Sequence, residues 1–168
     1  MNWPNPRQVD RSPLELISGD AFFKEFGVQP THFARAPGRV NLIGEHIDYH
    51  DLPVFPMAIQ RQVYLAFRCR DDGVVRIRSV SEDFEEVEFE IGREITANLP
   101  GHWGNYLKAP ADELARRFTI SRGFDGVLVS DIPIAAGLSS SSALVNVVGL
   151  ALAAVSYTHL TLPTIYSV

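Results

Sequence analysis

The sequence is poor in cysteine, in excess positive charge and in long apolar runs, and each shortage excludes a class of protein. Its 168 residues include one cysteine, Cys69, which excludes an internal disulfide and fits a reducing compartment. The net charge of −5 and the scattered basic residues argue against nucleic acid as a partner. The longest apolar stretch, 143–155, falls short of the roughly 20 residues that cross a bilayer, and the start is polar. We expect a cytoplasmic protein without a membrane partner; its oligomeric state stays open.

Local patterns predict a folded α+β domain. Apolar residues make up 46% of the chain and charged residues 21%, which is typical of globular proteins. Ser12 followed by Pro13 and Glu15 predicts a capped helix that ends near Gly27, with a possible break at 19–20. Further helices are predicted over 103–118, where Pro110 either kinks the helix or starts a second one, and over 139–155.

Alternating apolar residues predict strands over 62–70, 74–80 and 86–91, and a short apolar strand over 126–130. The turn residues 71–73 predict a hairpin between the first two strands, within an antiparallel meander that has one solvated face. We divide the chain into an N-terminal helical segment (1–30), a central domain (31–155) and an aberrant tail (156–168). The tail abandons the helical pattern, and our hypothesis is that the natural sequence stops near Val155.

Two stretches combine chemistry with open backbone. In "GRVNLIGEHIDY" (38–49), charged and imidazole side chains alternate with aliphatic ones, which is typical of a lined pocket. In "PIAAGLSSSSAL" (133–144), Gly137 and four serines precede an apolar helix. Unpaired N–H groups and the partial positive charge at a helix start can hold a phosphate. The simpler alternative is an N-cap serine followed by a core helix.

The first stretch closely resembles the signature of galactokinases, and the second resembles the phosphate-binding motif of the same family, the GHMP sugar and metabolite kinases. The resemblance covers roughly residues 33–155. It implies the N-terminal domain of a GHMP kinase: a twisted mixed sheet backed by helices, with the C-terminal domain absent. It also implies ATP, Mg²⁺ and a small sugar as ligands.

The resemblance implies a role for each matching residue. Glu45, His46, Asp48 and Tyr49 would bind the sugar, and Arg39 would lie beside a catalytic aspartate. The adenine would stack near Trp103 and Tyr106, which at i, i+3 could instead simply pack on the core. The phosphates would be held by Gly137, Leu138, Ser139, Ser140, Ser141 and Ser142, and Ser141 would also contact Mg²⁺. His46 and His50 could suggest a metal site, and Arg39 with Glu45 a structural ion pair.

The implied reaction is ATP-dependent phosphorylation of galactose at its anomeric hydroxyl. The catalytic aspartate of the family lies C-terminal to the serine helix, so we expect little turnover from this chain itself. The sequence departs from the family where an Asn and a glycine commonly follow Tyr49, and where Ala135 and Ala136 replace glycines. Three alternatives stay open: a kinase for N-acetylgalactosamine or arabinose, a non-catalytic sugar and ATP sensor, and a poorly folding truncated product.

Overall fold

The structure, a computed structural model, describes residues 12–44, 47 and 50–156. Its helices and strands follow in the order α1 (Pro13–Phe26), β1 (His32–Ile43), β2 (Phe55–Cys69), β3 (Val74–Ser79), β4 (Val87–Glu90), α2 (Gly104–Arg117), β5 (Phe124–Ser130) and α3 (Ser140–Val155). This confirms an α+β architecture. The division of the chain at residues 30 and 155 stays a prediction, and the tail beyond residue 156 lies outside the described residues.

Helix α1 begins and ends where the local signals predict. The Oγ of Ser12 accepts a hydrogen bond from the N–H of Glu15 at 3.2 Å, which caps the first turn. Gly27 takes the left-handed conformation (φ 69°), and its N–H donates to the carbonyl of Phe23. The predicted break at 19–20 is wrong: the helix is continuous. Likewise α2 runs unbroken through Pro110.

The strands form one mixed sheet in the order β1-β2-β5-β3-β4. Three of the pairs are antiparallel, whereas β3 runs parallel to β5, with Ile77 opposite Gly126. The predicted hairpin at 71–73 is therefore wrong, because β5 lies between β2 and β3. The turn instead packs on the start of β5: the Gly123 N–H donates to the carbonyl of Asp72 at 2.7 Å. The mixed sheet itself confirms the architecture that the resemblance implied.

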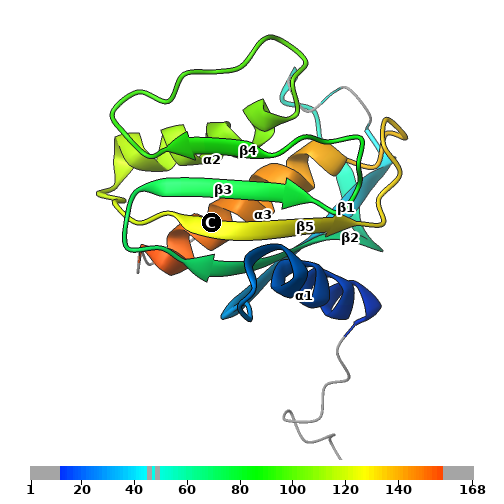
Figure 1. Ribbon diagram of the computed structural model, residues 1–168. Coiled ribbons are helices and arrows are strands. Elements are labelled where there is room, and N and C mark those ends of the chain that lie inside the picture. Colours follow the sequence, from blue (N-terminus) through cyan, green and yellow to red (C-terminus); the bar gives the residue numbers. More distant parts are fainter. Residues whose placement is uncertain (1–11, 45–46, 48–49, 157–168) are drawn as a thin grey trace, which may run out of the picture.

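Helices cover both faces of this sheet (Figure 1). Helices α2 and α3 pack on one face and enclose the main core, whose fully buried members include Leu65, Val75, Ile77, Phe124, Val147 and Leu152. Helix α1 covers β2 and β5 on the other face, where Phe22 packs with Ala66 and Val127. Because residues 63–67 of β2 are buried on both faces, the prediction of one solvated face is wrong for that part of the strand.

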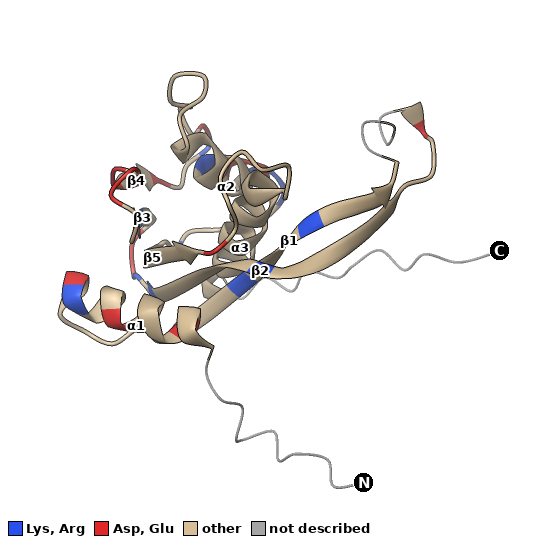
Figure 2. Ribbon diagram, turned by 90° about the vertical axis from the view of Figure 1, so that its right-hand side faces the viewer, with Lys and Arg blue, Asp and Glu red and all other residues tan. Residues whose placement is uncertain are grey.

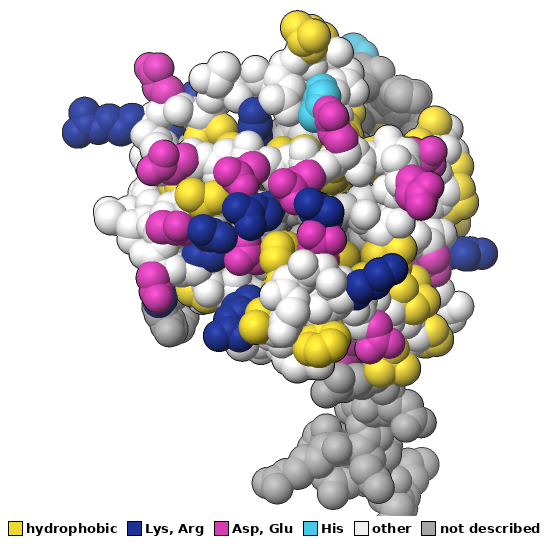
Figure 3. All heavy atoms as spheres, viewed as in Figure 1, with side chains coloured by type: hydrophobic (Ala, Val, Ile, Leu, Met, Phe, Trp, Pro, Cys, Tyr) yellow, Lys and Arg dark blue, Asp and Glu magenta, His cyan; other side chains and the backbone are white. Residues whose placement is uncertain are grey.

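Beyond α1, that second face stays solvated and carries paired charges. Figure 3 shows basic and acidic side chains interleaved there. Arg70 donates to Asp72 at 2.7 and 2.8 Å and to Asp125 at 2.9 Å. Arg76 pairs with Glu88 at 2.7 Å, and the other pairs there join Arg78 to Glu25 and Glu86. The charges on this face are therefore largely compensated by one another, without a patch of one sign.

The outer ends of β1 and β2 form a two-stranded ribbon that extends away from the helices (Figure 2). Ile43 lies opposite Phe55 in the register, and their side chains are 72% and 62% exposed. Residues 45–46 and 48–49 of the first motif belong to the connection between these strands and lie outside the described residues. In the part of the chain that the structure describes, no helix combines the length and apolarity that a membrane crossing requires.

Candidate active site

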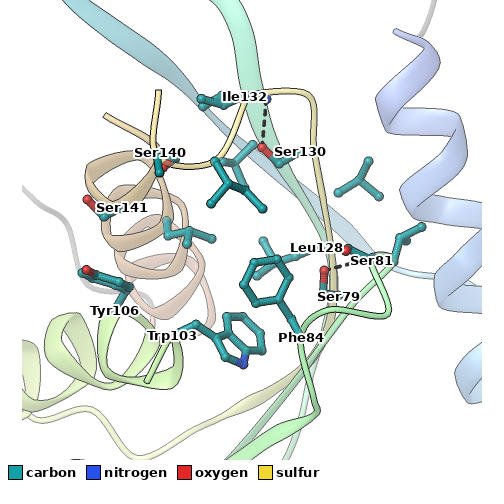
Figure 4. Close-up of a pocket in the computed structure, with 16 residues that line it drawn as sticks. Ser79, Ser81, Phe84, Trp103, Tyr106, Leu128, Ser130, Ile132, Ser140 and Ser141 are labelled. Carbon is teal, nitrogen blue, oxygen red and sulfur yellow. Dashed lines mark hydrogen bonds between the residues drawn. The ribbon is translucent and has the colours of Figure 1, made fainter. Parts of the chain in front are cut away.

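A cavity of about 660 Å³ opens between the loop after β3, the start of α2, the end of β5 and the start of α3 (Figure 4). Its lining combines aromatic rings, aliphatic side chains and serine hydroxyls, and none of the described residues that line it is charged. The residues that matter below are Ser79, Ser81, Phe84, Trp103, Tyr106, Ser130, Ile132, Ser140 and Ser141. The cavity therefore has an aromatic wall and a serine-rich wall, as a ligand with an apolar end and a polar end requires.

The aromatic wall comes from the start of α2 and the loop after β3. Trp103 and Tyr106 lie one helical turn apart, and both line the cavity. The ring of Phe84 packs on Trp103, with centroids 5.3 Å apart and an angle of 57° between the planes. Trp103 packs partly against the main core, whereas Tyr106 is 44% exposed. These rings can thus provide a stacking surface for a flat ligand as well as structural support.

The serine-rich wall is the first turn of α3. Ser140 and Ser141 line the cavity, and the N–H of Ala143 donates to the carbonyl of Ser139, which places Ser140 to Ser142 in the turn whose N–H groups have no acceptor within the helix. Ser139 does occupy the N-cap position of this largely buried helix, as the simpler alternative predicted, but its φ is 60° and its side chain makes no capping bond. A 16-residue helix that starts at the cavity wall can hold an anion there.

The two motifs contact each other through their backbones. The Arg39 N–H donates to the carbonyl of Leu138 at 3.1 Å, and the Ser139 hydroxyl donates to the carbonyl of Arg39 at 3.5 Å. Gly38 permits this approach, since a Cβ there would lie 2.8 Å from the Leu138 carbonyl oxygen. The structure thus joins the start of the first motif to the serine loop. The side chain of Arg39 is exposed and does not line the cavity.

Not every predicted site residue lies in the cavity. Leu138, Ser139, Gly137 and Ser142 belong to the same loop and first turn but do not line it. The four predicted sugar ligands, Glu45, His46, Asp48 and Tyr49, lie outside the described residues, so their roles stay predictions. The suggested ion pair of Arg39 with Glu45 and the His46–His50 metal site also stay predictions, because Glu45 and His46 lie outside the described residues.

Two of the departures from the family pattern fall at strained backbone, whereas a third, Ala136, does not have a positive φ. Asp51 stands where the family commonly has a glycine, and its φ is 58°. Ala135 replaces a glycine and has φ 57°. This left-handed region favours glycine, although Asp tolerates it better than most residues. The backbone thus keeps a glycine-like conformation at both positions without the glycine.

The described residues offer few groups for a metal ion. Among them no cluster of three His, Cys, Asp or Glu side chains is placed to hold one. Asp131, which precedes the serine loop, accepts a hydrogen bond from the Gln62 N–H at 2.6 Å and pairs with Arg61. A Mg²⁺ ion commonly binds one or two carboxylates together with substrate phosphates. Within this part of the chain, the Ser141 hydroxyl would be a ligand only alongside a bound phosphate.

Sequence reasoning missed Phe84 in the aromatic wall and the part of the lining made by Ser79, Ser81, Ser130 and Ile132. The Ser79 and Ser130 hydroxyls each accept a backbone N–H two residues on, from Ser81 and Ile132, both at 3.1 Å. These residues belong to a strand end and two turns without a motif. Only the strand order brings them beside α2 and α3.

Two family models match the chain. The galactokinase galactose-binding signature matches residues 20–69, and the GHMP kinase N-terminal domain matches residues 105–168. The chain therefore has the fold of a GHMP kinase N-terminal domain. The signature over residues 20–69 is specific to galactokinases. The chain resembles a galactokinase from Chloroflexus aggregans, with 48% identity over 129 residues.

Solved structures agree with this assignment of the GHMP kinase fold. The chain is similar to Lactococcus lactis galactokinase complexed with galactose, with a TM-score of 0.73 and 32% identity, over 85% of this chain and 37% of that one. Methanococcus jannaschii mevalonate kinase shares the fold at 19% identity and a TM-score of 0.64, over 77% and 42% of the two chains. The match to the Chloroflexus protein spans 77% of this chain and 33% of that protein. The chain thus spans about a third of the length of the relatives it matches.

Proposed function

We propose that the parent protein of this GHMP kinase chain transfers the γ-phosphoryl group of ATP to the anomeric hydroxyl of galactose. The chain would supply the nucleotide cavity and the sugar-binding motif. The observation that carries the proposal is the meeting of the aromatic wall and the serine-rich helix start in one cavity, next to the backbone contact between the two motifs. An adenine and a chain of phosphates have the matching polarity.

Each group has a role that its chemistry allows. Trp103 and Tyr106 would stack on the base, and the N–H groups and hydroxyls of 139–142 would bind the phosphates. Gly137 and Leu138 would shape the loop that approaches them. Bound Mg²⁺ would neutralise phosphate charge, with Ser141 as its contact on this chain.

The sugar end of the site rests on the first motif. Glu45 and Asp48 would accept hydrogen bonds from sugar hydroxyls, while His46 and Tyr49 can donate or accept them. Arg39 would offset charge on the transferring phosphoryl group. The resemblance places the aspartate base C-terminal to α3, so low turnover by this chain stays a prediction, as does a cytoplasmic location.

Nucleotide binding by the chain itself tests the cavity. In a Trp3→Phe background, Trp103 is the remaining tryptophan, and we expect Mg·ADP to quench its fluorescence saturably. Replacing Tyr106 with alanine should weaken binding by roughly 1–3 kcal/mol, the value typical of a base on an aromatic ring. Leu99→Ala, an exposed apolar change outside the cavity, is the control. If Tyr106→Ala and Leu99→Ala bind Mg·ADP with equal affinity, the adenine does not stack on Tyr106.

The sugar is tested with the product of the complete gene. We expect ³¹P NMR to detect galactose 1-phosphate from ATP and galactose, and slower reaction with N-acetylgalactosamine and arabinose. Faster reaction with either competitor would assign the enzyme to that sugar. Saturable binding of sugar and nucleotide without phosphorylation of any sugar would indicate a sensor instead.

A further inference from the structure

The loop after β3 and the start of α2 are joined by two neighbouring side-chain contacts. The ring of Phe84 packs on Trp103. The residue after Phe84, Glu85, forms a hydrogen bond of 2.8 Å with the residue before Trp103, His102. Phe84 and Trp103 both line the cavity, whereas Glu85 and His102 do not. The hydrogen bond therefore joins the two elements that form the aromatic wall, the loop after β3 and the start of α2.

The hydrogen bonds of His102 fix which ring nitrogen carries the proton. Its Nδ1 accepts from the Gly104 N–H at 3.0 Å, so the proton of the neutral ring is on Nε2 and is donated to the Glu85 carboxylate. The Asn98 side chain lies 2.8 Å from the same Nδ1, and the Asn98 Oδ1 accepts from the Lys108 ammonium at 2.7 Å. This contact fixes the Asn98 amide so that its NH₂ faces the imidazole.

The same ring also supports the start of α2. Trp103 occupies the N-cap position but makes no side-chain capping bond, so the imidazole of His102 satisfies one of the first N–H groups of the helix. The packing is close: a Cβ at Gly104 would lie 2.5 Å from the Asn98 Nδ2 and 2.9 Å from the His102 Nδ1. His102 thus holds one end of α2 and, through Glu85, the loop that carries Phe84.

We propose that His102 is a positioning residue for the nucleotide pocket, and that its hydrogen bond to Glu85 holds the loop that carries Phe84 against Trp103 in the aromatic wall. This inference rests on the proposed function for its ligand, but the position of Trp103 can be measured without one. The hydrogen bond between Glu85 and His102 holds the pocket in its binding shape before a ligand arrives. Removing this bond should therefore weaken nucleotide binding without any change in the groups that line the cavity.

The test uses the 168-residue chain in the Trp3→Phe background, with Mg·ADP as the probe. Glu85→Ala removes the acceptor, whereas Glu85→Gln keeps an oxygen acceptor and should rescue it. The side chain of Glu85 is 75% exposed, so these changes leave the fold intact. His102→Asn keeps an acceptor near Gly104 but loses the donor to Glu85. Glu86→Ala is the matched control, because that carboxylate pairs with Arg78 on the other face of the sheet.

For Glu85→Ala and His102→Asn we expect Mg·ADP to bind roughly three- to tenfold more weakly, the range for one lost hydrogen bond. Acrylamide should quench Trp103 more strongly in both variants without nucleotide, while Glu85→Gln and Glu86→Ala should match the parent. Parent-like acrylamide quenching in Glu85→Ala would overturn the proposal. It would also be overturned if Glu85→Gln showed the same increase in quenching and the same loss of Mg·ADP affinity as Glu85→Ala. If the unmodified chain binds no Mg·ADP, the proposed function fails. The comparison of acrylamide quenching still decides whether the Glu85–His102 hydrogen bond positions Trp103.

Discussion

Ala135 shows how a single residue can be at odds with its backbone. Its φ of 57° lies in the left-handed region, where a Cβ costs roughly 1–2 kcal/mol. We therefore expect Ala135→Gly to raise the free energy of unfolding by about 1 kcal/mol. Glycine also gives the unfolded chain more conformational entropy, which offsets part of this gain. Urea denaturation measures the change.

The adjacent residue supplies the control for that change. Ala136 is also exposed but does not have a positive φ, so glycine there should lower stability slightly through the unfolded state. If Ala135→Gly proves no more stable than Ala136→Gly, backbone strain at Ala135 is not relieved by glycine.

The pair Arg70–Asp72 predicts a pH dependence. The hydrogen bonds from the Arg70 guanidinium lower the pKa of Asp72 from its ordinary 3.8 to about 2. Because the folded state prefers the ionised carboxylate, this contribution is present above the unfolded pKa and is lost as the pH falls from about 4 to about 2. We expect the stability of the unmodified chain to fall more steeply over this window than that of Asp72→Asn, and parallel denaturation curves would contradict it.

At the scale of elements, the contact between β1 and the serine loop depends on Gly38. A Cβ there would lie 2.8 Å from the Leu138 carbonyl oxygen and 3.1 Å from the Ile59 Cδ1. We expect Gly38→Ala to destabilise the chain by about 1–3 kcal/mol, since a backbone atom must shift to admit the methyl group. The matched control is Gly92→Ala, where no atom lies within 4 Å of the added Cβ. Similar unfolding free energies for Gly38→Ala and Gly92→Ala would show that the serine loop moves to admit the methyl group without loss of stability.

The helices and most strand spans could be predicted from the sequence because their signals are local. The Ser12 cap, the Gly27 stop and the alternation in β4 each act within a few residues. The strand order could not be predicted this way. The turn at 71–73 marks a change of direction, but only the pairing of Val75 with Phe124 decides which strand comes beside β3. That contact joins residues far apart in the chain.

The candidate site divides in the same manner. Trp103, Tyr106, Ser140 and Ser141 belong to recognisable motifs, and the structure brings all four to one cavity. Ser79, Ser81 and Phe84 could not be found, because a strand end and a turn acquire a role only from what packs beside them. The left-handed conformation of Ser139 could not be predicted, because no local pattern indicates that its hydroxyl donates to the distant Arg39 carbonyl.

At the scale of the whole molecule, one main core links the sheet to α2 and α3, and Trp103 packs against that core. We therefore expect thermal unfolding to be cooperative, with far-UV circular dichroism and Trp103 fluorescence giving the same midpoint in the Trp3→Phe background. Leu152→Ala, fully buried on α3, should move both transitions together and lower stability by about 2–5 kcal/mol. Leu150→Ala, 49% exposed on the same helix, should leave both nearly unchanged. A fluorescence transition that precedes the loss of secondary structure would instead mean that the cavity loosens before the core, and a melt without cooperativity would favour the poorly folding product.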